Sequence, residues 1–92
     1  MSERASDIWT AYLQDRRQEV SDQRRMIDCW MRLEPFFGER IGNGITKDDC
    51  RAYASMRTRQ GRANSTIKTE LDYLRAALNF HYGRGRVAVW TP

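Results

Sequence analysis

The chain has 92 residues, of which 40% are hydrophobic and 30% charged, with only 6 Gly and 2 Pro. This length suits a single domain with a modest core, and the composition excludes a disordered or fibrous chain and a large multi-site enzyme. Sixteen Lys and Arg against 12 Asp and Glu leave a net charge of +4, which favours a polyanionic partner.

Caps and hydrophobic spacing predict the first two helices. The first begins near Ser6 or Asp7, which are both good N-cap residues, and ends before Ser21. Ser21 caps the second helix, and Pro35 and Gly38 close it. Apolar residues recur there every three or four positions and are expected to face the core, while Gln23, Arg24 and Asp28 face outward. The expected core stripe consists of Met26, Ile27, Trp30, Met31 and Leu33.

Residues 36–45 are predicted to form a turn-rich connector whose Phe and Ile side chains plug the bundle. Thr46 and Asp49 then have the spacing of a capping box, which predicts the start of a third helix over residues 47–59. Gly61 follows this helix and can adopt the left-handed conformation that ends it.

The fourth helix is the best defined, with Asn64 or Ser65 as its cap and Gly83 as its end. Its apolar stripe consists of Ile67, Leu71, Leu74, Leu78 and Tyr82. Residues 87–90 either pack back on the bundle or run out extended. Because no pair of strands is long enough for a sheet, we expect an all-α bundle of four to five short helices.

The cysteines and the single histidine offer no cofactor chemistry. Cys29 and Cys50 have no metal-binding or disulfide spacing, so we expect two free, partly buried thiols and no cofactor. His81 is expected to be half-buried rather than a general base. No apolar run reaches the ~20 residues of a membrane span, and the polar start is not that of a signal peptide. These features favour a cytoplasmic protein with no membrane partner.

The positive charge lies in the second half of the chain. Residues 1–50 carry 8 basic and 10 acidic side chains (net −2), whereas residues 51–92 carry 8 basic and 2 acidic ones (net +6). Only Lys47 and Lys68 are lysines, and arginine binds phosphate in a bidentate manner. The alternative is a solvated arginine-rich surface that binds nothing.

The densest candidate site is the segment 57–68, which places four basic residues around a helix end, a turn and the next helix start. The unpaired amides, small hydroxyls and dipole of a helix start favour phosphate. The predicted phosphate contacts are Arg59, Arg62, Asn64, Ser65, Thr66 and Lys68. The alternative is that Asn64 and Ser65 only cap the helix and that the arginines pair with Glu70, Asp72 or solvent.

A second candidate is the outward face of the second helix, which carries Ser21, Gln23, Arg24 and Arg25 and is extended by Asp28 and Arg32. Arginine and glutamine at exposed helical positions can reach base edges in a major groove. The same residues also form the ordinary polar face of a soluble helix.

Four motifs follow one another in a set order: Ile8-Trp9-Thr10-Ala11-Tyr12-Leu13, a helix start at Ser21, Ile45-Thr46-x-x-Asp49, and Gln60 to Ile67 leading into Leu71 to Phe80. In this order they resemble the N-terminal core-binding domain of tyrosine recombinases, the phage integrase family. The resemblance implies a SAM-like bundle over residues 1–87 that clamps duplex DNA at the core recombination site during DNA integration and site-specific recombination. Residues 88–92 would begin a linker to a catalytic domain.

In this family a separate catalytic domain grips the opposite face of the DNA and carries the nucleophilic tyrosine. None of the tyrosines here lies in that nucleophile motif, so the resemblance implies a chain that binds DNA without cleaving it. The implied partners are double-stranded DNA, the catalytic domain and a homo-tetramer in the synapse. DNA contacts would lie on the second and fourth helices, with Gln23, Arg24, Lys68 and Arg75 as the groove contacts and Arg25 beside them.

The alternative function is a helical protein-interaction module. In that case Phe36, Phe37, Val89 and Trp90 would be exposed and dock another chain, and the arginines would only keep the surface soluble.

Overall fold

The computed structural model describes residues 3–17 and 23–92. Its elements are α1 (Ala5–Arg16), α2 (Gln23–Phe37), the 3-10 helix η1 (Gly42–Gly44), α3 (Lys47–Arg59) and α4 (Asn64–Tyr82). The only β pairing among these residues is an isolated antiparallel bridge between Arg4 and Ile41. The prediction of a small all-α bundle is therefore confirmed.

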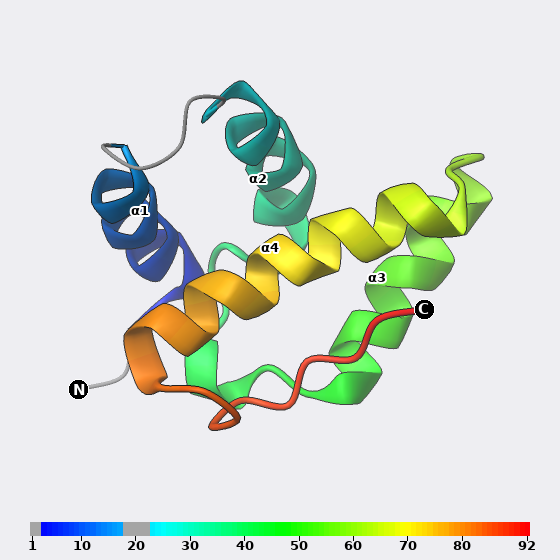
Figure 1. Cartoon of the computed structure of the whole chain (residues 1–92). Coiled ribbons are helices and arrows are strands. Elements are labelled where there is room, and N and C mark those ends of the chain that lie inside the picture. Colours follow the sequence, from blue (N-terminus) through cyan, green and yellow to red (C-terminus); the bar gives the residue numbers. More distant parts are fainter. Residues whose placement is uncertain (1–2, 18–22) are drawn as a thin grey trace.

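The long helix α4 runs through the middle of the molecule and contacts each of the other three α-helices. Helices α1 and α2 lie along one side of α4, and α3 and the C-terminal segment lie along the other (Figure 1). As a result every residue of α4 from Thr69 to Asn79 is buried or half-buried. The exposed residues of this helix lie at its ends, and those at its start, 64–66 and 68, adjoin the turn that joins α3 to α4.

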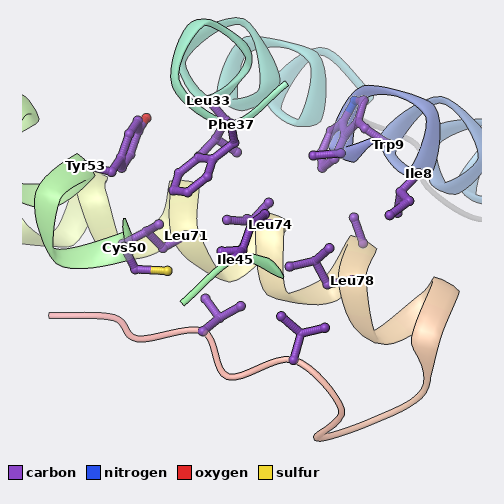
Figure 2. Packing of buried hydrophobic residues seen from close by; sticks show 14 of the residues in the cluster. Ile8, Trp9, Leu33, Phe37, Ile45, Cys50, Tyr53, Leu71, Leu74 and Leu78 are labelled. Carbon is purple, nitrogen blue, oxygen red and sulfur yellow. The ribbon is translucent and has the colours of Figure 1, made fainter. Parts of the chain in front are cut away.

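The predicted apolar stripe of α4 forms the centre of the core, and its four aliphatic residues are fully buried. Figure 2 shows Leu33 and Phe37 of α2 pointing toward Leu71 and Leu74 of α4. Burying large aliphatic and aromatic side chains of this kind stabilises the fold by about 1.5–3 kcal/mol for each of them. Because α4 supplies residues to every part of this core, its position is fixed from both sides.

The predicted stripe of α2 is wrong in part. Ile27 and Met31 are 42% and 65% exposed, and the buried residues of this helix are instead Met26, Cys29, Leu33 and Phe37. Trp30 is half-buried and stacks on Trp9 of α1, with ring centroids 5.0 Å apart. The buried face is thus centred on the side that carries Cys29, and Ile27 and Met31 lie outside it.

The predicted start of α1 is wrong, and the predicted end of α2 is wrong only for Pro35. Helix α1 begins at Ala5, before Ser6 and Asp7, and no side chain caps it. The backbone carbonyls of Arg40 and Gly38 accept instead from the amides of Ala5 and Ser6, at 2.8 and 3.0 Å. Helix α2 contains Pro35 and continues to Phe37, because a proline in the last turn removes only one backbone hydrogen bond. The predicted end at Gly38 is confirmed, and Pro35 does not close the helix. The predicted cap Ser21 lies outside the described residues.

The predicted boundaries of α3 are confirmed. Thr46 Oγ1 accepts from the amide of Asp49 at 3.2 Å, and the Asp49 carboxylate accepts from the amide of Thr46 at 2.9 Å. That second hydrogen bond holds the pKa of Asp49 below its usual value. Beyond the helix, Gly61 has a φ of 84°, which a residue with a side chain rarely adopts. The turn into α4 is therefore tight.

The C-terminal segment folds back against α3 and α4. Val87 and Val89 are buried in the core, and Trp90 is half-buried beneath the guanidinium of Arg51. The exposed apolar surface expected for a protein-interaction module is wrong for Phe37 and Val89, which are both buried, while Phe36, like Trp90, is partly buried. These side chains pack inside the domain instead.

His81 is exposed rather than half-buried, and its ring contacts the edge of Tyr82. Phe80 is exposed as well, so these two positions in the last turn of α4 face solvent and not the core. Tyr82 still faces inward, and its hydroxyl accepts from the amide of Asn43 at 3.2 Å.

A buried ion pair joins the end of α3 to the start of α4. Arg57 and Glu70 are 5% and 4% exposed, and their side chains meet through two hydrogen bonds of 3.0 and 2.8 Å. The hydroxyl of Tyr53 donates to the same carboxylate at 2.7 Å, and Arg57 also donates to Gln60 Oε1 at 2.7 Å. Hydrogen bonding to Glu70 raises the pKa of Arg57, and burial raises that of Tyr53. Every charge in the cluster is compensated.

Breaking this pair on one side should destabilise the protein strongly. Arg57→Met leaves the Glu70 carboxylate buried with only the hydroxyl of Tyr53, so the free energy of unfolding should fall by about 3–5 kcal/mol. Urea denaturation followed by circular dichroism measures this loss. The control Arg57→Met/Glu70→Gln removes both charges, keeps an acceptor for Tyr53 and should recover part of the loss. A loss below about 1 kcal/mol for Arg57→Met would contradict this account.

Candidate nucleic-acid interface

The start of α4 leaves its backbone donors free. Its N-cap is Ala63, which has no side chain to cap the helix, and within the described residues the amides of Asn64 and Ser65 have no hydrogen-bond partner. The prediction that Asn64 or Ser65 caps the helix is wrong, because both lie inside its first turn. Free amides at a helix start are a favourable environment for an anion.

The starts of α1 and α3 are less suited to an anion. Backbone carbonyls occupy the first amides of α1, whereas in α3 the capping box occupies the amides of Thr46 and Asp49 and leaves those of Lys47 and Asp48 without a partner among the described residues. The first turn of α3 carries the carboxylates of Asp48 and Asp49, which repel an anion, whereas the first turn of α4 combines free amides with no acidic residue. The tight turn at Gly61 brings Arg62 next to these donors, and Ser65 and Thr66 add exposed hydroxyls.

Arginines from two helices surround a hollow beside this helix start. It encloses about 240 Å³, and Arg25 and Arg32 of α2 line it together with Arg62 and Thr66. Arg25, Arg32 and Arg62 make no ion pair or side-chain hydrogen bond with another described residue. Asp28 lines the hollow as well, and so does the compensated pair of Arg57 and Glu70. Three unpaired guanidiniums thus face a single carboxylate, so the hollow is strongly cationic.

This hollow continues along α4. A second hollow of about 230 Å³ shares Arg25 and Thr66 with the first, and a third of about 340 Å³ shares Arg25 with both and extends to Ala76. We call the three together the α2–α4 groove. The helical part of its wall from Ser65 to Ala76 is about 16 Å long. This length accommodates several phosphates, since successive phosphates of one strand advance about 3.4 Å along a duplex.

The structure divides the predicted site residues into three groups. Arg25, Arg62, Ser65 and Thr66 line the α2–α4 groove. Arg59 and Asn64 line a separate hollow beside α3 and the C-terminal segment. The remaining four, Gln23, Arg24, Lys68 and Arg75, line none of these hollows. The predicted phosphate contacts between Arg59 and Lys68 therefore lie on two sides of α4 and do not form one binding surface.

Two of the remaining four residues, both of them cations, are already paired. Asp72 binds Lys68 Nζ at 2.7 Å and Arg75 Nη1 at 3.4 Å. Arg75 also donates to the carbonyl of Val89 at 2.9 Å. These pairs are partly exposed and are worth at most about 1 kcal/mol each, so a phosphate can displace them. The alternative that arginines of residues 57–68 pair with acidic side chains is confirmed for Arg57, which binds Glu70.

Gln23 and Arg24 lie at the start of α2. Gln23 is half-buried, and its side-chain amide donates to the carbonyl of Arg17 at 2.9 Å. Arg24 is exposed and has no ion pair or hydrogen bond with a described residue. Of these two predicted groove contacts, only Arg24 is free to reach a ligand without giving up a contact.

Both cysteines are free and buried, as expected. Cys29 lines the α2–α4 groove, and burial raises the pKa of its thiol to about 11. Burial also raises the pKa of Cys50, whose sulfur accepts from the backbone amide of Trp90. Both thiols are therefore protonated near neutral pH and are poor nucleophiles.

Sequence reasoning underestimated Arg32, which it placed at the margin of the second candidate. The available signal was its spacing of seven residues from Arg25, since two helical turns return a side chain to the same face. It also missed the role of Asp72 as a shared partner of two cations. The position of Arg32 beside Arg62 depends on how α2 packs on α4, which no local pattern specifies.

The described residues contain no group of three or more His, Cys, Asp or Glu side chains placed to hold a metal ion. Among the helices described, none combines the length and apolar character that crossing a bilayer requires. Searches with family models, curated proteins and solved structures found no match to this chain.

Proposed function

We propose that this chain is a DNA-binding domain that holds duplex DNA against the α2–α4 groove. The observation that carries the proposal is the meeting of Arg25 and Arg32 with Arg62 around one hollow, beside the free amides of Asn64 and Ser65. Guanidiniums and backbone amides are the groups that hold DNA phosphates and set the register of a protein on the duplex.

The surface around the groove suits a polyanion better than a small anion. The three arginines come from separate parts of the sequence and line a groove that continues along α4 instead of closing around one ligand. Arg24 lies one residue from Arg25 on the exposed side of α2 and can contact a base edge. In this arrangement α4 binds phosphates and α2 approaches the bases.

We further propose that the domain belongs to a tyrosine recombinase, as the core-binding half of a clamp around DNA. The order of the sequence motifs supports this, and so does the agreement between the helices that carry DNA contacts in that family and those that carry the groove here. In this proposal the chain binds DNA and does not itself cleave a strand. A catalytic domain and other copies of the same protein would be its partners in recombination.

Charge reversal in the groove should abolish most duplex binding. With about four to six phosphates neutralised, a plot of log K against log salt should have a slope of roughly −4 to −5. Arg25→Glu/Arg62→Glu should weaken binding by about 10- to 100-fold at low salt and reduce the slope by about 2, because each lost phosphate contact removes about one unit. Fluorescence anisotropy of a labelled duplex measures both quantities.

The matched control for this variant is Arg84→Glu/Arg86→Glu. It makes the same change in net charge at two exposed arginines beyond the end of α4. The control should bind duplex much more tightly than the groove variant. Equal losses in the two variants, or a slope near zero in the unaltered protein, would overturn the proposal.

Releasing the paired cations of α4 should strengthen duplex binding. Asp72→Asn frees Lys68 and Arg75 from their shared carboxylate. The salt slope should become steeper by about 1, and binding at low salt should tighten about 2- to 10-fold. Asp48→Asn changes the charge equally on α3, away from the groove, and should have a smaller effect. Tightening that is no greater for Asp72→Asn than for Asp48→Asn would show that only net charge matters.

A further inference from the structure

A separate hollow of about 570 Å³ lies between α3, the start of α4 and the C-terminal segment. We call it the Trp90 hollow, after the aromatic residue in its wall. It shares no lining residue with the α2–α4 groove, and α3 and the C-terminal segment run along the opposite side of α4 from α2 (Figure 1). Its volume lies in the range of sites that bind small organic ligands.

The backbone that carries Trp90 is anchored to α3 and α4. The backbone amide of Trp90 donates to the sulfur of Cys50, and the carbonyl of Val89 accepts from Arg75 at 2.9 Å. The guanidinium carbon of Arg51 lies 5.4 Å from the centroid of the indole ring. The hollow is thus bordered by an aromatic ring and a planar cation that are already positioned.

Polar groups with unused capacity line the rest of the hollow. Arg59 is exposed and makes no ion pair or hydrogen bond with a described residue. The side chain of Asn64 also makes no hydrogen bond with a described residue. Its backbone amide is one of the two free donors at the start of α4. Ser55 adds an exposed hydroxyl. Arg51 is not free, because its Nη1 forms an ion pair with Asp48 Oδ1 at 3.1 Å.

We propose that the Trp90 hollow binds one unpaired nucleotide. The base would lie against the pair of Trp90 and Arg51, and the 5′-phosphate would bind Arg59 and the amide of Asn64. Aromatic rings and guanidinium planes are the surfaces on which unpaired bases stack, and arginine is the side chain that best fits a phosphate. An acidic peptide would use the arginines but leave the indole without a stacking partner.

This site goes beyond duplex binding. The bases of an intact duplex are stacked on one another and cannot reach the indole, so the ligand has to be a free nucleotide or an unpaired position of a strand. The two sites share no lining residue, and only the backbone amide of Asn64 lies beside both, so substitutions of their arginines can disable either site while the other still binds.

The indole N–H signals of the three tryptophans in a two-dimensional NMR spectrum provide the test, with thymidine 5′-monophosphate as the probe. The signal of Trp90 should shift on titration, while those of Trp9 and Trp30, which stack on each other away from the hollow, should stay in place. Thymidine alone and inorganic phosphate alone should each bind at least about 10-fold more weakly, because each supplies half of the contacts.

Variants locate the ligand and separate the two sites. Trp90→Ala, followed through the amide signal of Asn64, should weaken binding by roughly 5- to 100-fold. Arg59→Glu replaces an exposed side chain without contacts and should weaken it at least about 10-fold. Arg25→Glu makes the same charge change in the α2–α4 groove and should leave nucleotide binding unchanged.

Three results would overturn the proposal. The first is a Trp90 signal that does not move at millimolar nucleotide. The second is an equal shift with a short acidic peptide, which would make the hollow a carboxylate site. The third is an equal loss of binding in Arg25→Glu and Arg59→Glu, which would mean that the nucleotide only follows net charge.

Discussion

The buried ion pair of Arg57 and Glu70 constrains how the walls of the α2–α4 groove and the Trp90 hollow are arranged. It joins α3 to α4 at the end where the two helices meet, and Tyr53 and Gln60 complete its hydrogen bonds. A buried pair of this kind contributes little net stability compared with apolar residues, but it strongly disfavours any packing that separates its members. The angle between α3 and α4 is therefore constrained, and so are the turn at Gly61 and the side chains on either side of it.

The uncapped start of α4 is a direct result of that geometry. A tight turn with a left-handed glycine brings the chain into α4 through Ala63, so no serine, threonine or aspartate occupies the cap position. This choice costs about 1 kcal/mol relative to a good cap. Two amides remain free between Arg62 on one side and Arg59 on the other. The same helix start can thus serve the α2–α4 groove and the Trp90 hollow, whose ligands would approach from opposite sides of α4.

Local patterns predicted the second half of the fold well because each of its signals is self-contained. The capping box at Thr46, the glycine at position 61 and the apolar stripe of α4 all act within a few residues. The buried face of α2 was mispredicted because Ile27 and Met31 also recur at helical spacing, and only packing against α1 and α4 decides which stripe is covered. For the same reason the sequence indicated Arg25 and Arg62 as candidates but could not show that they share a groove, or that Asp72 holds two of the other cations.

We propose above all that duplex DNA docks on the α2–α4 groove. The most direct measurement is an NMR titration of the isotope-labelled chain with a short duplex, read through the backbone amides. The account predicts the largest shifts in residues 25–32 and 62–69, with the amides of Asn64 and Ser65 among the strongest. Shifts confined to α1 and to residues 83–86, or spread evenly over the surface, would contradict it.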